Sequence, residues 1–413
     1  MDRPIITIFR TLAVTLALAT TTACATGGNL YRPGPSMLSA GPVEDFDRYV
    51  QSVRAHVATN LVPVSGFERE QQVEWNLPFR RTPAAGCPSG DRTGLLLVHG
   101  LSDSPFVFRD LAEYLAAHCV EVRSLLLQGH GTRPGDMVTA SAEVWRAQVR
   151  DHFTALSQEV DRAFIGGFSL GGALATDYAL ADSGPRPAGL IAVAPAWQLN
   201  GLRDYLWLAP IADAFGDFLE KEPELNPVKY ESFSFNAGSQ LDTVMSAVQK
   251  RMSESRSLEM PLFLAATEAD SVINLEYLVS RFRERFTHPA NTMIIFRDTR
   301  NPWPEAMADD RIQFLNSYLP EANILEFSHQ SLLISPDNEL YGLGAPLQRC
   351  LEPNNLSLEA CRELPEEELW FSAWHDTERP VFTSRLTYNP CFSELAGGML
   401  AFLKANGAAT TAP

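Results

Sequence analysis

The chain has 413 residues, of which 45% are hydrophobic and 20% are charged, and its formal net charge is −17. This is the composition of an ordinary globular protein, long enough for one large core with insertions or for two modest domains. The strong negative charge argues against a nucleic-acid partner and against binding an anionic membrane surface through basic patches. A small, neutral or apolar substrate is easier to accommodate.

Residues 1–23 read as a signal peptide, with a weakly basic start, an Ala-rich apolar run and a small-residue cleavage site. The run is too short and too rich in Thr to be a good membrane span. Cys24 resembles the lipid-modified cysteine of bacterial lipoproteins, although Thr21 stands where that pattern usually has Leu. We therefore expect an exported protein. It is either a cell-envelope lipoprotein, in contact with the membrane only through an anchor at Cys24, or a secreted protein.

Residues 24–41 are rich in Gly, Pro and Ser and predict a tether, so that the folded domain occupies 42–413. Short apolar runs that end in glycine alternate with amphipathic stretches, which is typical of a doubly wound, mostly parallel α/β sheet. The predicted strands are 73–79, 94–100, 120–127, 163–167, 189–194, 261–267, 291–297 and 324–327, and the predicted helices are 43–58, 106–117, 141–160, 170–181, 275–286 and 392–404.

Two long segments interrupt this alternation. Residues 195–259 show little strand periodicity and predict a helical insertion over the sheet. Residues 335–389 are rich in Pro and contain cysteines, and a structureless loop of that length is unusual in a compact domain. We therefore expect 335–389 to be an accessory element.

Export places the cysteines in an oxidising compartment, where some of them pair. Cys350 and Cys361 bracket a short loop and make the most plausible bridge. Cys87 and Cys119 are candidates for a second bridge that leaves Cys391 unpaired, but the sequence leaves the pairing open. No C-x-x-C pair or cysteine-histidine cluster indicates a metal, and we expect neither metal nor organic cofactor.

Ser169 lies between Gly167 and Gly171 in GGFSLGG, after a predicted strand and before a predicted helix. This is the nucleophile-elbow pattern, in which a sharp turn raises the serine hydroxyl above the sheet. The alternative is a glycine-rich loop that happens to contain a serine. The strand before Ser169 and the helix after it favour the nucleophile.

A nucleophilic serine needs a base and an acid to orient that base, and in this strand order both follow the serine. Asp270 comes at the carboxyl end of the predicted strand 261–267, with Glu268 as a nearby competitor. Of the histidines after Ser169, His329 directly follows an apolar run, whereas His288 lies in a helix-to-strand turn and His375 in the accessory segment. We therefore predict Asp270 and His329 as the acid and the base.

The remaining histidines fall before Ser169 in the chain. Among these, His56 and His152 lie in predicted surface helices, where solvated roles suffice. The oxyanion of an acyl-transfer intermediate needs two backbone N–H groups. We expect one from Leu170, directly after the nucleophile, and the other from Leu101, after the strand that ends in His99-Gly100.

The motifs LLLVHGLSDSP, GHGTRPGD, GGFSLGG, the Asp270 loop and SHQS occur in this order. Together they resemble the α/β-hydrolase superfamily, in particular its carboxylesterase and monoacylglycerol lipase branch. The resemblance covers roughly 93–331 and the final helix. It implies a triad of Ser169, Asp270 and His329, oxyanion donors at Leu101 and Leu170, and a cap at 195–259 that lines an acyl pocket.

The chain departs from this family in two places. His329 lies 59 positions after Asp270, where the family usually has one helix and one strand, and the excursion after His329 is also unusual. The sequence predicts a serine hydrolase that acts on a small ester or acyl substrate through an acyl-enzyme. The alternatives are a serine peptidase or acyltransferase of the same fold, or an envelope protein that uses the fold for binding or scaffolding. The oligomeric state is not predicted.

Overall fold

The computed structural model describes residues 30–88, 90–181, 183–201, 216–254, 257–354, 356–374 and 380–407. The predicted signal peptide, Cys24, the start of the tether, His375 and part of the predicted cap lie outside the described residues. Among the helices in the described ranges, none is both long enough and apolar enough to cross a bilayer.

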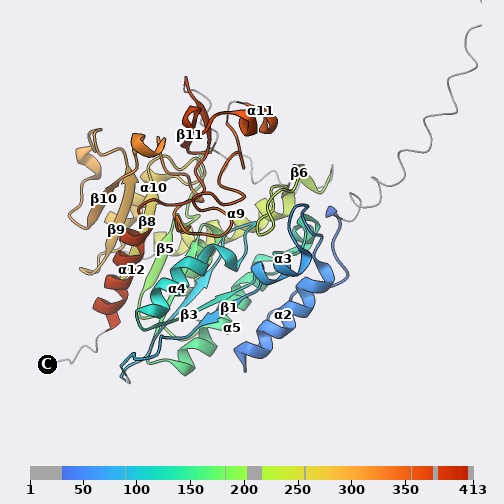
Figure 1. The fold of residues 1–413 in the computed structure, drawn as a ribbon. Coiled ribbons are helices and arrows are strands. Elements are labelled where there is room, and N and C mark those ends of the chain that lie inside the picture. The colour runs from blue at the N-terminus through green and yellow to red at the C-terminus, as the bar shows by residue number, and fades with distance from the viewer. Residues whose placement is uncertain are drawn as a thin grey trace, which may run out of the picture.

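An eight-stranded sheet forms the centre of the protein, in the order β1-β3-β2-β4-β5-β8-β9-β10 (Figure 1). Neighbouring strands run parallel, except that β1 at one edge runs antiparallel to β3. The strands are β1 (Phe79–Arg81), β2 (Thr93–Val98), β3 (Val120–Leu125), β4 (Arg162–Phe168), β5 (Leu190–Val193), β8 (Leu262–Thr267), β9 (Thr292–Arg297) and β10 (Ile312–Asn316). The doubly wound, mostly parallel sheet is thus confirmed.

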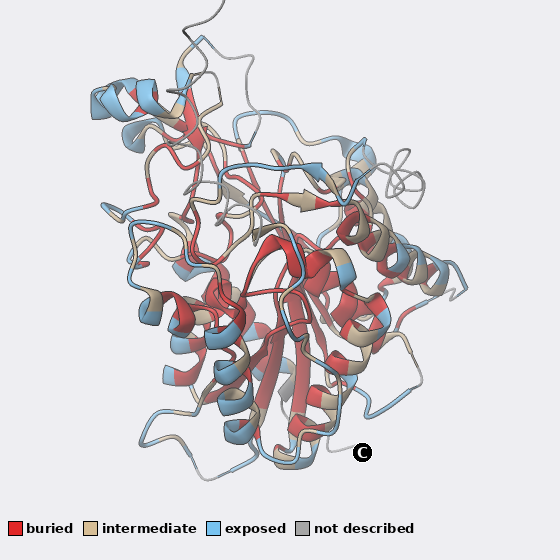
Figure 2. Cartoon of the chain, turned by 90° about the vertical axis from the view of Figure 1, so that its right-hand side faces the viewer, coloured by how far each residue is buried: buried red, intermediate tan, exposed pale blue. Residues whose placement is uncertain are grey.

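Helices cover both faces of the sheet, and the strands between them are almost entirely buried (Figure 2). α4 contacts α12 on one side, whereas α5 packs against α6. The helices are α2 (Phe46–Asn60), α3 (Arg69–Trp75), α4 (Arg109–Ala117), α5 (Ala142–Glu159), α6 (Leu170–Ala179), α9 (Phe235–Glu254), α10 (Leu275–Arg285), α11 (Leu358–Glu363) and α12 (Phe392–Gly407). Burial on both faces explains why the central strands are continuous apolar runs.

The predicted strand at 73–79 is wrong for most of its length. The chain forms α3 up to Trp75, and only Phe79–Arg81 joins the sheet as β1. Val73 and Trp75 are buried on α3, and the side chain of Gln72 donates to the backbone carbonyls of Val64 and Phe67. An alternating apolar pattern was therefore produced by a short helix followed by an extended segment.

The predicted strand at 324–327 is also wrong, because β10 takes the place beside β9. Ile324 makes only isolated bridges, to Leu319 and to Phe371 of the accessory segment. Phe327 is buried, and its ring stacks on that of Phe296 with 5.2 Å between the centroids. Packing in the core, and not a strand, therefore accounts for the apolar residue at this position. β10 escaped prediction because this edge strand is only partly buried and lacks a continuous apolar run.

The two interrupting segments are compact in their described parts. Between β5 and β8 the chain forms a two-stranded antiparallel pair, β6 (Phe218–Glu220) and β7 (Phe233–Ser234), followed by α9. The excursion after His329 contains α11 and a parallel pair, β11 (Leu369–Ser372) and β12 (Phe382–Arg385). Figure 1 shows the excursion as orange and red loops at the top of the molecule, above the sheet.

The two disulfides join the pairs that the sequence favoured. Cys87 bonds to Cys119 and Cys350 bonds to Cys361, whereas Cys391 is a free cysteine. The first disulfide ties the loop before β2 to the turn before β3. The second closes a loop within the excursion.

Candidate active site

Ser169 occupies a sharp turn between β4 and α6. Its backbone has φ 53° and ψ −117°, a conformation that is rare for a residue with a side chain. The turn is fixed on both sides, because Ser169 N–H donates to the Val193 carbonyl (3.0 Å) and the Ser169 carbonyl accepts from Ala196 N–H (2.9 Å). Such strain costs about 1–3 kcal/mol and is retained mainly at functional sites.

The glycines around Ser169 are required by close approach of the backbone. A Cβ at Gly167 would overlap the backbone of Gly171, and a Cβ at Gly171 would overlap the carbonyl oxygen of Val98 at the end of β2. Without side chains at Gly167 and Gly171, α6 can begin at Leu170, directly after the turn. Ser169 itself is half-buried.

The side chains of Asp270 and His329, the predicted acid and base, are in contact. His329 Nδ1 lies 2.7 Å from Asp270 Oδ2, and both residues are buried. The other carboxylate oxygen, Oδ1, accepts from the backbone N–H groups of Val272 and Ile273, each at 2.8 Å. Because a carboxylate only accepts hydrogen bonds when ionised, Nδ1 carries the hydrogen, and Nε2 is the acceptor of the neutral ring.

The loop that carries Asp270 is held by the chain that follows β5. The side-chain amide of Asn200 donates to the carbonyls of Asp270 (2.8 Å) and Ile273 (3.0 Å). Glu268, the competing acid in the sequence, points elsewhere and pairs with Arg297. The structure therefore brings Asp270, and not Glu268, to His329.

The loop that carries His329 is anchored to the accessory segment. Ser328 Oγ donates to the Leu386 carbonyl at 2.7 Å, and Thr267 Oγ1 at the end of β8 donates to the Phe327 carbonyl at 3.1 Å. The imidazole packs on the ring of Phe168, 4.8 Å between centroids. Since Phe168 directly precedes Ser169, the base lies against the turn that carries the nucleophile.

The predicted oxyanion donors lie on two segments that meet at Ser169. The position of a Cβ on Gly100 would be 3.4 Å from the Cβ of Ser169, so the loop after β2 touches the turn. Among the hydrogen bonds of the described residues, none uses the backbone N–H of Leu101 or of Leu170. Unused N–H groups on both sides of a nucleophile are what an oxyanion requires.

His99 and His130 form a buried pair behind this loop, 4.8 Å between ring centroids. His99 Nε2 accepts from the Leu127 N–H (3.1 Å), which positions the end of β3 against the end of β2. Burial lowers the pKa of His99 well below its ordinary value and lowers that of His130 to about 4. Both rings are therefore neutral near pH 7 and support the loop.

Other groups near the site were not found from the sequence. Asp103, Lys229, Tyr341 and Arg385 line a small cavity together with Phe168. They come from four separate segments, so no spacing in the sequence links them. In the described ranges, His, Cys, Asp and Glu side chains form no group of three or more that is suited to a metal ion.

Comparison with known proteins matches residues 91–225 to the family model Serine aminopeptidase, S33. The thermostable monoacylglycerol lipase of Bacillus sp. (strain H-257) is 28% identical over 184 residues, which are 44% of this chain and 71% of that protein. The chain has the α/β-hydrolase fold. Asp270, His329 and the excursion lie beyond the residues that the family model matches.

Solved structures similar to this chain include a metagenome-derived lipolytic enzyme from the study of LipS and LipT and the monoacylglycerol lipase of Paleococcus ferrophilus. The first has a TM-score of 0.45 and 22% identity and covers 53% of this chain and 86% of its own. The second has a TM-score of 0.43 and 22% identity and covers 53% and 87%.

Proposed function

We propose that this α/β-hydrolase cleaves carboxylic esters through an acyl-enzyme intermediate. The observation that carries the proposal is the 2.7 Å contact of Asp270 with His329, whose ring packs beside the strained turn of Ser169. The similarity to a monoacylglycerol lipase supports an ester as the substrate. Ser169 has positive φ directly before a helix and between glycines that have no room for a side chain, which is the arrangement of a nucleophile elbow.

In this proposal Ser169 Oγ attacks the ester carbonyl while His329 Nε2 takes its proton. The oxyanion that forms accepts hydrogen bonds from the N–H groups of Leu101 and Leu170. The C–O bond to the alcohol then breaks, and the alcohol leaves with the proton from His329. Water, activated by the same imidazole, hydrolyses the acyl-serine, and Asp270 stabilises the imidazolium in both steps.

A fluorophosphonate probe and a short-chain aryl ester test this proposal. We expect the purified protein to be labelled and to hydrolyse 4-nitrophenyl butyrate, and Ser169→Ala to abolish labelling and to lower kcat by about 10³-fold or more. Ser253→Ala is the matched control, because the Ser253 hydroxyl donates to the Lys250 carbonyl on α9, away from Ser169. If the protein is not labelled and hydrolyses no ester, the proposal fails, and the alternative of a binding or scaffold protein is favoured.

A second candidate is an aminopeptidase, because the matching family model describes serine aminopeptidases. The same three side chains serve amide hydrolysis, so the site alone does not distinguish the two. Aminoacyl-coumarin amides provide the comparison. A kcat/KM for these amides above that for 4-nitrophenyl butyrate would replace the ester by a peptide as substrate.

The proposal includes export, with residues 1–23 removed and Cys24 lipidated at the new N-terminus. It rests on the sequence pattern alone. The intact mass of the protein isolated from its native cell tests it. An unmodified residue after the cleavage site would contradict lipidation and leave plain secretion.

A further inference from the structure

A small cavity of about 20 Å³ lies beside the candidate active site. Phe168, the residue before Ser169, and Gln330, the residue after His329, form part of its wall. Asp103 on the loop after β2 lines it as well. A cavity of this volume has room for about one water molecule, and therefore for one oxygen atom of a ligand.

Two cations from distant parts of the chain line this cavity. Lys229 precedes β7 in the cap, and Arg385 ends β12 in the accessory segment. Both approach one carboxylate, that of Glu352, with Lys229 Nζ at 3.8 Å and Arg385 Nε at 2.6 Å. One negative charge thus lies between two positive charges.

Arg385 needs hydrogen-bond partners inside the protein more than Lys229 does, because its side chain is only 3% exposed. Among the described residues, its Nη2 has no hydrogen-bond partner. A buried charged donor without an acceptor is costly, and such groups in native proteins usually have a partner. A ligand oxygen in the cavity would supply that partner.

Two further acids face these cations without neutralising them fully near pH 7. Burial raises the pKa of Asp103 to about 7 and the pKa of Glu231 to about 7. Asp103 Oδ1 already accepts from the Ser104 N–H (2.8 Å), and Glu231 Oε2 accepts from the Leu225 N–H (3.2 Å). Both carboxyls are therefore partly protonated near pH 7, so neither opposes the two cations with a full negative charge.

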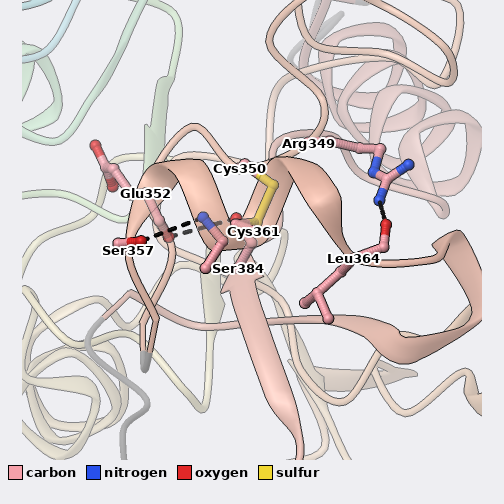
Figure 3. The surroundings of a disulfide bond; sticks show 8 residues. Arg349, Cys350, Glu352, Ser357, Cys361, Leu364 and Ser384 are labelled. Atoms are coloured by element: carbon pink, nitrogen blue, oxygen red, sulfur yellow. Dashed lines mark hydrogen bonds between the residues drawn. A yellow bond between two sulfur atoms is a disulfide. The ribbon is translucent and has the colours of Figure 1, made fainter.

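Contacts within the excursion hold Glu352 and Arg385 in position. The Cys350–Cys361 disulfide closes the loop beside Glu352, whose carboxylate points away from the disulfide in Figure 3. The Glu352 carbonyl accepts from Arg385 N–H (3.0 Å) and from Ser384 Oγ (3.4 Å). On the opposite side, Tyr230, next to Lys229, donates its N–H to the Ser102 carbonyl at 2.7 Å. Cap and excursion thus present their cations to the loop of Asp103.

We infer that Arg385 and Lys229 form a subsite for a carboxylate on the substrate, so that the preferred ester bears a negative charge near its scissile bond. This inference rests on the proposed ester hydrolysis and names its substrate class. The excursion is then a specificity element, and the subsite lies outside the residues matched by the family model.

Matched pairs of esters test the inference. In one pair the acyl group differs, mono-4-nitrophenyl glutarate against 4-nitrophenyl pentanoate, which has a methyl group in place of the carboxylate. In the other pair the leaving group differs, 4-acetoxybenzoate against 4-methylphenyl acetate. After subtraction of spontaneous hydrolysis, we expect kcat/KM to favour the anionic ester by about tenfold or more in one pair, the equivalent of one charge-assisted hydrogen bond. A ratio near one in both pairs would overturn the inference.

Substitutions identify the cations responsible. We expect Arg385→Met and Lys229→Met each to lower the ratio of anionic to neutral kcat/KM by about tenfold. Lys250→Met on α9 is the control, because Lys250 is exposed and its ion pair is with Glu254 on the same helix. Arg385→Met leaves Glu352 without its closest cation, so Arg385→Met with Glu352→Gln is made as well. Unchanged ratios in the Lys229 variant and in the double variant contradict the assignment.

A binding measurement separates this inference from the proposed reaction. Glutaric acid monoanilide and pentananilide differ in the same carboxylate and are stable amides. We expect Ser169→Ala protein to bind the anionic anilide at least about tenfold more tightly, and the added Lys229→Met change to remove the difference. If no ester is hydrolysed but this preference is found, the proposed reaction fails and the anion subsite stands. Equal binding overturns the subsite whatever the reaction is.

Discussion

The His329 ring and the Asp270 carboxylate meet at 2.7 Å although His329 comes 59 positions after Asp270 in the chain. Both oxygens of the carboxylate are used, one by His329 and the other by the N–H groups of Val272 and Ile273. The carboxylate is therefore fixed before any substrate arrives. This fixes the tautomer of the imidazole and leaves Nε2 as its free acceptor.

Asp270→Asn tests this relationship. The amide retains the shape of the carboxylate but cannot stabilise an imidazolium, and its NH₂ group favours the wrong tautomer of His329. We expect kcat for 4-nitrophenyl butyrate to fall by about 10²–10⁴-fold with the fold intact, which steady-state kinetics and thermal unfolding would show. Glu268→Gln is the control, since Glu268 pairs with Arg297 and does not contact His329. A larger loss of kcat in Glu268→Gln than in Asp270→Asn would indicate that Glu268, and not Asp270, is the acid of the triad.

Gly171→Ala tests the close packing under the nucleophile. A Cβ at this position would overlap the carbonyl of Val98, an atom of the central sheet that cannot move aside easily. We expect a destabilisation of about 2–4 kcal/mol and a loss of esterase activity. Gly397→Ala in α12 is the control, because the nearest atom to its Cβ would be the Tyr114 hydroxyl at 3.7 Å. There we expect a gain of about 0.5–1 kcal/mol from the better helix former, and denaturant titration measures both values.

His152→Phe tests a pH dependence that comes from burial. His152 lies on α5 between Phe46 and Tyr49, 4.3 Å from the Tyr49 ring centroid, and it is 4% exposed. The prediction of a surface helix at this histidine is therefore wrong, because α2 covers it. Burial, aided by the charge of Arg123, lowers the pKa of His152 to about 3.

Because the unfolded chain binds the proton at about pH 6.5 and the folded chain only near pH 3, this group destabilises the fold as the pH falls between these values. We expect the Tm of the wild-type protein to fall more steeply than that of His152→Phe between pH 6.5 and 4. The exposed His118 provides the control, and His118→Gln is expected to retain the wild-type slope. Equal slopes in all three proteins would show that His152 does not contribute.

The fold could be predicted from the sequence where burial of a strand or helix produces a recognisable pattern of apolar residues. β2, β4 and β8 lie between helices on both faces, so each is a continuous apolar run whose limits are close to those predicted. β10 is an edge strand with exposed positions, and nothing distinguishes it from a loop. The missed strand led to the wrong strand before His329, yet His329 lies where its chain order indicated.

The candidate site also contains residues that could be predicted from the sequence and residues that could not. Ser169 is marked by glycines that the turn requires, and Asp270 and His329 follow strands or apolar runs, so local pattern and chain order sufficed to select them. Their catalytic roles stay a prediction until the activity is measured. Lys229, Glu352 and Arg385 have no local pattern, because the cavity exists only after cap and excursion have packed against the loop after β2. Such a subsite is visible only in three dimensions.

The Cys350–Cys361 disulfide provides the last prediction. It closes a loop over a sequence separation of 11, and a loop of this length restricts the unfolded chain by about 2.5–3 kcal/mol. Cys361 is buried, and the loop carries Glu352, which pairs with Arg385 at the cavity. We expect Cys350→Ser with Cys361→Ser to lower the Tm and also to lower the ratio of anionic to neutral ester hydrolysis, because Glu352 is no longer held in place.

Cys391→Ser is the control, as Cys391 is free and takes no part in this loop. A lower Tm with an unchanged ratio would assign the disulfide to stability alone, and the same result after reduction with dithiothreitol would exclude an effect of the serine side chains.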